Sequence, residues 1–337
     1  MVADHEKGGI TSGFGDRFGA VAIGRNEGEK LHRCLQSLTA ANCVVYVDSG
    51  SSDRSVQYAR DLGLEVVELD MSLPFTAARA RNAGFRRLRE RAPEIRYVQY
   101  VDGDCEIRPD WPDRAVAFLE AHPDFAVVFG RRRERYPRLT VYNWLCDQEW
   151  NGPAGEVRAC GGDSMMRVIA VEATEGYRDD MIAGEEPEFC LRLRAAGWRI
   201  WRLPDEMTLH DAAMTSFWQW WRRTMRSGFA FAQGASLHRA APERHFLWES
   251  RRALLWGLWL PLGCLACTLA LWPWGLLMWL LYPLQFLRQT IRNPGSMLDR
   301  TTISFFQLLG RFPEALGQIK FFWGRMLGRQ APLIEYK

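Results

Sequence analysis

Short apolar runs alternate with longer amphipathic segments from residue 18 onward. The apolar runs have the length of strands and predict strands at 18–23, 43–47, 64–69, 97–101 and 125–129. Apolar residues spaced for one helical face predict helices at 26–38, 53–62, 76–91 and 111–121. Strands that alternate with helices predict an α/β fold with a Rossmann-like, mostly parallel sheet. Ligands of such sheets bind at the carboxyl ends of the strands.

Residues 130–215 have a less regular pattern. They contain a glycine-rich turn at 159–163 and an acidic cluster at 184–188 that leads into a helix. We expect this stretch to complete the same domain, which then extends over 18–215, after a polar, flexible leader at 1–17. The leader has no apolar segment of signal type, so we expect the domain to be cytosolic and its cysteines reduced.

The region from 253 to 287 contains no charged residue, and arginines flank it at both ends. As one helix it would be about 50 Å long, against a hydrocarbon core of about 30 Å, so a single straight span fits poorly. Pro273 predicts a break and therefore a membrane hairpin over 251–292, with both basic ends on the cytoplasmic side. A re-entrant or monotopic hairpin, two full spans and a buried pair of soluble helices remain alternatives.

Two segments beside this hairpin are amphipathic. Residues 216–250 are rich in tryptophan and arginine and predict interfacial helices. Residues 293–337 carry phenylalanine, leucine and arginine in a pattern that is typical of helices at a membrane surface. We therefore expect the chain to be associated with membrane lipids through its C-terminal part.

Composition narrows the choice of function. The chain has 337 residues, of which 47% are hydrophobic and 25% charged, so a packed core is expected. Its net charge of +3 is too small to indicate a nucleic-acid partner. The eight cysteines have no repeated spacing and no accompanying histidine pair. The one CxxC motif, Cys264 to Cys267, lies in the uncharged run and is interpreted as apolar packing.

Two aspartates follow the fourth predicted strand directly. Asp102 and Asp104 are separated by one glycine, so both carboxylates can reach one hard cation. Carboxylates together with substrate phosphates are the usual ligands of Mg²⁺ in such sites, and Mn²⁺ prefers the same donors. Surface turns contain the same motif, but its place at a strand end favours a metal site.

The second predicted strand also ends in an aspartate. Asp48 begins a loop of small residues that would let a ligand approach the backbone, which favours a ligand role for its carboxylate. Asp53, at the end of this loop, is interpreted as a helix N-cap.

Two further motifs admit a functional and a structural interpretation. Glu185 and Glu186 would repel one another, which favours a general base, but acidic residues also stabilise a helix N-terminus. The motif Gln219-Trp-Trp-Arg222-Arg223 can clamp a diphosphate or an acceptor. A helix at a membrane surface would have the same composition.

Taken in order, these motifs resemble the family 2 glycosyltransferases, with their GT-A fold. The resemblance covers about residues 18–235 and rests on the motifs Ile23-Gly-Arg25-Asn26-Glu27, Asp48 to Asp53, Arg81-Asn82-Ala-Gly84, Asp102-Gly-Asp104, Gly161-Gly162-Asp163, Gly184-Glu185-Glu186 and Gln219-x-x-Arg222-Arg223. The chain departs from the family pattern where it lacks a proline in the first motif and has Glu186 in place of an aspartate. Arg223 replaces the tryptophan of processive members.

The resemblance implies a role for each of these residues. It implies a nucleotide site formed by Ile23, Arg25, Glu27, Asp48, Arg81 and Asp102. It implies Mn²⁺ or Mg²⁺ held by Asp104, Asp102 and His210. It implies an acceptor or diphosphate site formed by Gly161, Gly162, Asp163, Gln219, Arg222 and Arg223. The catalytic base would be Glu186, with Glu185 as the alternative.

The expected activity is that of an inverting glycosyltransferase of the hexosyltransferase type. It would move a sugar from a nucleotide-diphosphate sugar, in this family most often a UDP-sugar, to a hydroxyl of a lipid-linked or cell-envelope polysaccharide acceptor. A catalytically inactive membrane-bound subunit for glycan assembly is one alternative, against which the retained Asp102, Asp104 and Glu186 speak. A nucleotidyltransferase is another, but the first strand leads into Gly24-Arg-Asn-Glu27 rather than a glycine-rich basic loop.

Overall fold

The computed structural model describes residues 17–240 and 242–328, which group into two compact units. The first unit contains the residues up to Tyr136, Cys146–Asp179 and Phe189–Ala212. The second contains Pro137–Leu145, Asp180–Glu188 and the residues from Ala213 onward. The predicted leader lies outside the described residues except for Arg17.

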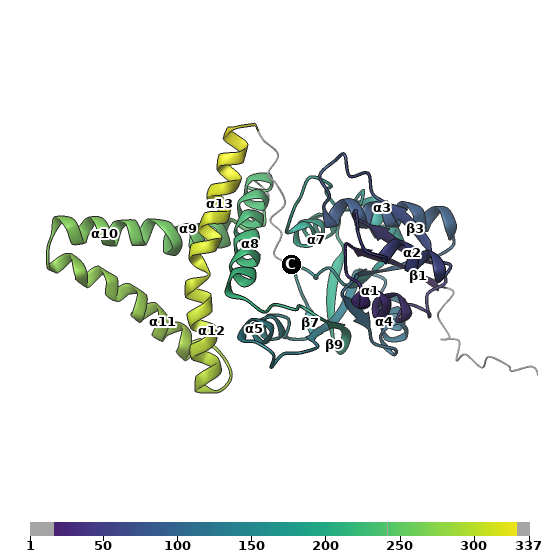
Figure 1. The fold of residues 1–337 in the computed structure, drawn as a ribbon, viewed down its shortest axis with the longest axis horizontal. Coiled ribbons are helices and arrows are strands. Elements are labelled where there is room, and N and C mark those ends of the chain that lie inside the picture. Colours follow the sequence, from purple (N-terminus) through teal and green to yellow (C-terminus); the bar gives the residue numbers. More distant parts are fainter. Residues whose placement is uncertain (1–16, 241, 329–337) are drawn as a thin grey trace, which may run out of the picture. The chain divides into compact units, whose positions relative to one another are not determined.

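A sheet forms the centre of the first unit (Figure 1). It has nine strands in the order β3-β2-β1-β4-β8-β6-β9-β5, with β7 paired to β9. Its strands are β1 (Phe18–Gly24), β2 (Val44–Asp48), β3 (Glu65–Glu68), β4 (Tyr97–Asp102), β5 (Cys105–Ile107), β6 (Phe125–Glu134), β7 (Gly155–Glu156), β8 (Ser164–Arg167) and β9 (Arg199–His210). The first four strands of this order pair in parallel, and so do β6 and β9. β8 lies antiparallel between β4 and β6. The predicted α/β class is therefore confirmed.

Helices cover both faces of this sheet. Successive residues of a strand point to opposite faces, so both faces carry apolar side chains that the helices bury. Val21 and Ile23 of β1 belong to one buried cluster with Leu88 of α3, whereas Ala20 and Ala22 belong to the other. The helices of this unit are α1 (Glu29–Gln36), α2 (Ser55–Asp61), α3 (Ala77–Arg91), α4 (Trp111–Ala121) and α6 (Val168–Ala173), with most of α7 (Glu185–Ala195).

Several elements differ from the sequence-based prediction. The helix expected from residue 26 begins at Glu29, because Asn26 and Gly28 have φ angles of 56° and 51°, outside the helical region. The fifth predicted strand continues from Phe129 to Glu134. The 12-residue strand β9 was not predicted, and its pairing with β6 shifts register around Pro204, which lacks the N–H that a regular ladder requires.

The second unit is helical. It contains α8 (Phe217–Leu237), α9 (Leu247–Leu254), a π-helical turn (Leu255–Trp259), α10 (Leu260–Ala270), a 3₁₀ helix (Trp274–Leu280), α11 (Leu281–Arg292), α12 (Met297–Leu309), α13 (Arg311–Met326) and the start of α5 (Val141–Glu149). Glycines let α8 and α13 touch, since a Cβ on Gly228 would lie 2.0 Å from the carbonyl oxygen of Glu314. A Cβ on Gly317 would likewise lie 2.0 Å from the carbonyl oxygen of Met225.

A hairpin projects from these helices. In Figure 1, α10 runs outward and α11 returns from the tip towards α12. The chain turns at Pro273, between the end of α10 and the following 3₁₀ helix, so the predicted break is confirmed. The continuous helix Leu247–Ala270 has a mean hydropathy of 1.8 in its most apolar window, of which 11% is buried. Among the described residues it is the one helix that is long and apolar enough to cross a membrane.

Candidate functional site

The carboxyl ends of three neighbouring strands bring the first group of predicted site residues together. Pairing of β1 with β4 sets Ile23 opposite Asp102, and pairing of β1 with β2 sets Gly24 opposite Asp48. Parallel strands end at one edge of a sheet, so these residues share that edge, as predicted. Arg25 and Glu27 follow directly in the loop after β1.

Asp48 is buried and holds its own loop. Its Oδ2 accepts the backbone N–H groups of Gly50, at 2.9 Å, and Ser51, at 2.8 Å. Its Oδ1 accepts the Tyr46 hydroxyl at 2.9 Å, and burial together with this carboxylate raises the pKa of Tyr46. The Asn26 side chain ties the loop after β1 to this one, because its Oδ1 accepts the N–H of Ser52 at 2.7 Å. The two loops thus form one braced rim.

Asp102 lies between two arginines. Its Oδ1 is 2.9 Å from Arg81 Nη2, and its Oδ2 is 3.1 Å from Arg132 Nη2. Burial alone would raise the pKa of Asp102, but the two guanidinium groups hold it below its usual value. Gly162 leaves room for this arrangement, since a Cβ there would lie 2.5 Å from Arg81 Nη2 and 2.8 Å from Asp102 Oδ2. Gly161 faces open space.

Asp163 contacts the backbone of Asp102, and its side chain is fully buried. Its Oδ1 accepts the backbone N–H of Asp102 at 2.9 Å, and its Oδ2 accepts the Thr208 hydroxyl at 2.8 Å. The same Oδ2 lies 2.8 Å from Arg132 Nη2. All these contacts are internal to the first unit.

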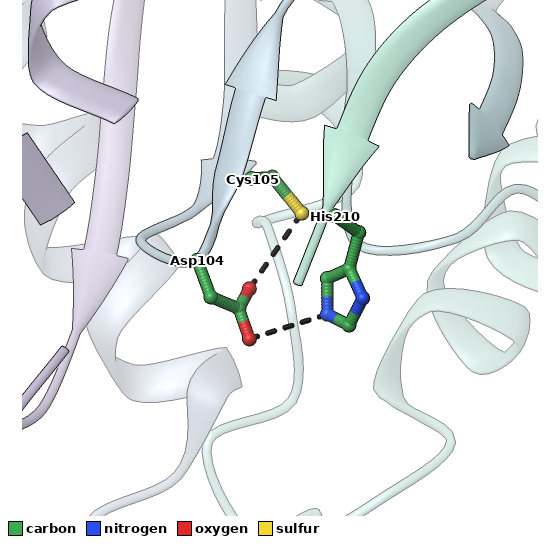
Figure 2. A group of neighbouring side chains, drawn as sticks. All are labelled: Asp104, Cys105 and His210. Carbon is green, nitrogen blue, oxygen red and sulfur yellow. Dashed lines mark hydrogen bonds and ion pairs between the residues drawn. The ribbon is translucent and has the colours of Figure 1, made fainter. Parts of the chain in front are cut away.

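Asp104 faces His210, as predicted, because β5 and β9 pair Cys105 with His210 (Figure 2). Asp104 Oδ2 lies 3.2 Å from His210 Nε2, and Glu134 Oε2 lies 3.5 Å from His210 Nδ1. Burial would lower the pKa of His210, but the Asp104 carboxylate and the bonds to both carboxylates raise it. The imidazole is therefore held between two carboxylates, as in the carboxylate–histidine pairs that orient metal ligands.

The donor atoms at this place fit a divalent cation. The side chains of Asp104, Cys105 and His210 offer ligand atoms within 4.8 Å of one another. Carboxylate oxygen and imidazole nitrogen suit Mn²⁺, and carboxylate oxygen suits Mg²⁺. Burial raises the pKa of the Cys105 thiol, and hard cations such as Mg²⁺ and Mn²⁺ favour oxygen donors over sulfur. A second group, Asp102, Cys105 and Asp163, has the same spacing, but the Arg132 guanidinium already contacts both of its carboxylates.

The predicted acid pair lies in the second unit. Glu185 and Glu186 begin α7, after Gly184 with a φ of 76°. Glu185 is buried, whereas Glu186 is partly exposed. In the same unit the buried Glu188 lies 3.0 Å from Nε2 of His238.

The tryptophan-rich motif forms the first turns of α8. The side-chain oxygen of Gln219 accepts the N–H groups of Thr215, at 2.8 Å, and Ser216, at 3.0 Å, in a capping box. Its side-chain oxygen thus helps to begin the helix, and its predicted role in a ligand clamp stays a prediction. Arg222 is exposed and Arg223 partly exposed, and their predicted roles stay predictions.

Three residues around the site were missed by the sequence-based prediction. They are Arg132, Glu134 and Trp150, none of which belongs to a motif named above. Trp150 packs edge-on against His210, with ring centroids 4.8 Å apart, and the Arg132 guanidinium lies 5.5 Å from a Trp150 ring. Of the three, only Arg132 has a sequence feature that could have indicated its place. It is the middle residue of three consecutive arginines in a strand, where side chains alternate between the two faces.

Comparison with known proteins gives one family match and several structural likenesses. Residues 22–157 match the family model described as Glycosyl transferase family 2. A mannosyltransferase, PcManGT from Pyrobaculum calidifontis, solved in complex with GDP-Man and Mn²⁺, has a TM-score of 0.61 and 18% identity over 92% of this chain and 88% of that one.

A second solved structure is similar over a comparable length. S. aureus TarS 1–349 in complex with UDP has a TM-score of 0.51 and 14% identity, over 93% of this chain and 92% of that one. Another S. aureus TarS structure has a TM-score of 0.49 and 17% identity over 71% of this chain. This chain spans only 45% of the length of that TarS chain. The family match and the first two likenesses confirm the GT-A fold that the motifs imply.

Proposed function

We propose that this chain, whose residues 22–157 match the family 2 glycosyltransferase model, transfers a sugar from a nucleotide-diphosphate sugar to an acceptor hydroxyl with inversion at the anomeric carbon. The observation that carries this proposal is the acidic strand end of Asp102 and Asp104 beside His210, at the edge where β1, β2 and β4 end. Ligands of such sheets bind at this edge.

The donor would lie along this edge with its diphosphate near Asp104. Asp104 and His210 would hold Mn²⁺ or Mg²⁺, and the solved mannosyltransferase with GDP-Man and Mn²⁺ supports a metal of this kind. A divalent cation there supplies positive charge that offsets the charge of the leaving diphosphate. We propose UDP-sugars as donors, and a GDP-sugar is the competing choice, since neighbours have been solved with both nucleotides.

The nucleotide would be held by the braced loops and by Arg81. The backbone around Ile23, with Arg25 and Glu27, would form one side of its pocket, and Asp48 would keep the opposite loop in shape. Arg81 is buried and ion-paired with Asp102, so its guanidinium is fixed rather than flexible. A fixed cation next to the diphosphate costs little reorganisation in the transition state.

We propose Glu186 as the general base that takes the proton from the acceptor hydroxyl. Of the two acids that begin α7, Glu186 is the one that is partly exposed and thus open to an acceptor. Deprotonation as the oxygen attacks the anomeric carbon leads to inversion, because the reaction is a single displacement. Glu185 is the alternative base, and Arg222 and Arg223 are candidate contacts of the acceptor or diphosphate.

We further propose that the hairpin enters a membrane from the cytoplasmic side and brings the site to a lipid-linked or cell-envelope glycan acceptor. The support is the row of exposed apolar side chains along it, among them Leu262, Leu269, Trp272, Leu277 and Leu284. Soluble monomers rarely expose a patch of this kind. The interfacial segment 216–250 and the amphipathic C-terminal segment would lie at the lipid surface beside it.

A donor panel tests the transferase proposal. The full chain in detergent is incubated with UDP- and GDP-sugars and Mn²⁺, with a lipid-linked acceptor fraction, and release of nucleoside diphosphate is measured. We expect release from one donor, a loss of at least a hundredfold in Glu186→Gln, and a smaller loss in Glu185→Gln. Binding of the donor nucleotide without turnover would favour the inactive-subunit alternative, and release of pyrophosphate from sugar phosphate and nucleoside triphosphate would favour a nucleotidyltransferase.

Flotation with lipid vesicles tests the membrane proposal. Apolar insertion resists salt, whereas attraction between arginines and anionic lipids is screened. We expect the chain to float with neutral vesicles even at about 1 M salt, where the Debye length is about 3 Å. A chain that floats only with anionic vesicles at low salt would contradict insertion of the hairpin.

A further inference from the structure

Three consecutive arginines in β6 divide between the two sides of the strand. Arg131 and Arg133 both contact Asp147, at 3.4 and 3.3 Å. Arg132 contacts Asp102 and Asp163 instead, and its side chain is 16% exposed. The alternation of a strand therefore separates one arginine that reaches the candidate site from two neighbours of the same charge that do not.

The Arg132 guanidinium contacts two carboxylates that would otherwise face one another without a cation between them. Asp102 and Asp163 offer oxygen atoms within 4.8 Å of one another, together with Cys105. Two like charges at this separation destabilise the ionised state of both, and the cost is larger for a buried group such as Asp163. The guanidinium between them compensates this charge, and the negative carboxylates in turn raise the pKa of Arg132 despite its burial. The guanidinium is thus a permanent cation of the fold.

The contacts of Asp163 extend this arrangement to the backbone of the metal motif. Its Oδ1 accepts the N–H of Asp102, the last residue of β4, and its Oδ2 is fixed by Arg132 and by Thr208 of β9. Asp104 lies only two residues beyond the bonded N–H. A change in this contact would therefore move both carboxylates of the motif relative to His210.

We propose that Arg132 and Asp163 are positioning residues for the donor site: they fix the end of β4 and the Asp102 carboxylate, so that Asp104 and His210 remain for the metal. This assignment rests on the proposed function, and it replaces the acceptor role predicted for Asp163. Arg81 contacts the other carboxylate oxygen of Asp102, Oδ1, so each of the two oxygens has its own arginine. Neither Arg132 nor Asp163 needs to touch the sugar, because both act through Asp102.

Hydrogen exchange of the full chain in detergent tests the backbone part of this proposal. Asp163→Ala removes the acceptor of the Asp102 N–H, so peptides that cover residues 100–104 should exchange at least tenfold faster. Arg133→Met serves as the matched control, since it removes the same charge from the same strand on the Asp147 side. Unchanged exchange in Asp163→Ala would overturn the proposed fixation of the strand end.

Nucleotide affinity tests the site part. Calorimetric titration with UDP and with GDP in the presence of Mn²⁺ should give an affinity at least tenfold weaker for Arg132→Met, and within twofold of the wild type for Arg133→Met. The pair Arg132→Met with Asp163→Asn should bind no more weakly than Arg132→Met alone, because the second change removes the uncompensated charge. Arg132→Met with wild-type affinity would overturn the positioning role, even if its melting temperature falls.

Two further variants keep the test decisive if Arg132→Met does not fold. Arg132→Lys keeps the charge but not the planar fork that spans two carboxylates, and Thr208→Val removes one bond to Asp163. Both should weaken the affinity for the Mn²⁺ nucleotide by a few-fold, and wild-type affinity in both would overturn the proposal. If the wild type binds neither nucleotide, the proposed function fails, while the exchange measurement still decides whether Asp163 holds the strand end.

Discussion

Replacing Leu269 with lysine should release the chain from lipid. Leu269 lies near the tip of the hairpin, at the end of α10, and is 77% exposed. On insertion scales a leucine at the centre of a membrane helix contributes about −0.5 kcal/mol and a lysine about +2.5 to +3.5 kcal/mol. The exchange should therefore cost about 3 kcal/mol, which corresponds to about a hundredfold weaker partitioning at about 1.4 kcal/mol per factor of ten.

The assay is flotation of the purified full chain with neutral vesicles at increasing lipid concentration. Ile169→Lys is the matched control, because Ile169 is 64% exposed on α6 of the first unit and undergoes the same change of charge. We expect the lipid concentration for half-maximal flotation to rise about a hundredfold for Leu269→Lys and to stay unchanged for the control. Equal curves for both variants would refute insertion of the hairpin tip.

Further predictions concern the site and the core. Gly162→Ala should weaken binding of the Mn²⁺ nucleotide at least tenfold in calorimetry, because its Cβ would lie 2.5 Å from Arg81 Nη2, whereas Gly263→Ala in α10, where a Cβ would face open space, should bind as the wild type. Gly84→Ala should lower the free energy of unfolding by about 1–3 kcal/mol in denaturant titration, since its Cβ would lie 2.3 Å from Cγ1 of Val21 in a packed core. EDTA should abolish release of nucleoside diphosphate, and excess Mn²⁺ should restore it; activity that persists in EDTA would contradict the metal-dependent mechanism.

The sequence predicts the parallel half of the sheet well because the strands of this half are apolar along most of their length. The strands β1, β2 and β4 are nearly continuous apolar runs, buried on both faces, and the helix Trp111–Ala121 has the predicted bounds. Strand β9 was not recognisable, since exposed and buried residues alternate imperfectly along it and Pro204 interrupts it. Tertiary pairing with β6, rather than local pattern, makes this segment a strand.

The site residues also divide into those that local sequence predicts and those that only tertiary pairing brings together. Asp102, Asp104 and Asp48 follow apolar strands, so their place at one sheet edge could be predicted from local sequence. The proximity of Asp104 to His210 depends on antiparallel pairing between residues that are far apart in the chain, and only the resemblance to a family indicated it. The role of Arg132 could not be predicted, because a run of three arginines is typical of a solvated surface and only the sheet shows which of them turns inward.

The most direct test of the central claim measures Mn²⁺-dependent release of nucleoside diphosphate by the full chain and by two aspartate variants. Asp104→Asn removes the carboxylate that faces His210, and Asp110→Asn makes the same change at an exposed residue before α4 of the same unit. The account predicts that Asp104→Asn loses at least a hundredfold in rate while Asp110→Asn retains the wild-type rate. Equal rates in both variants would contradict a metal-dependent transferase built on this strand end.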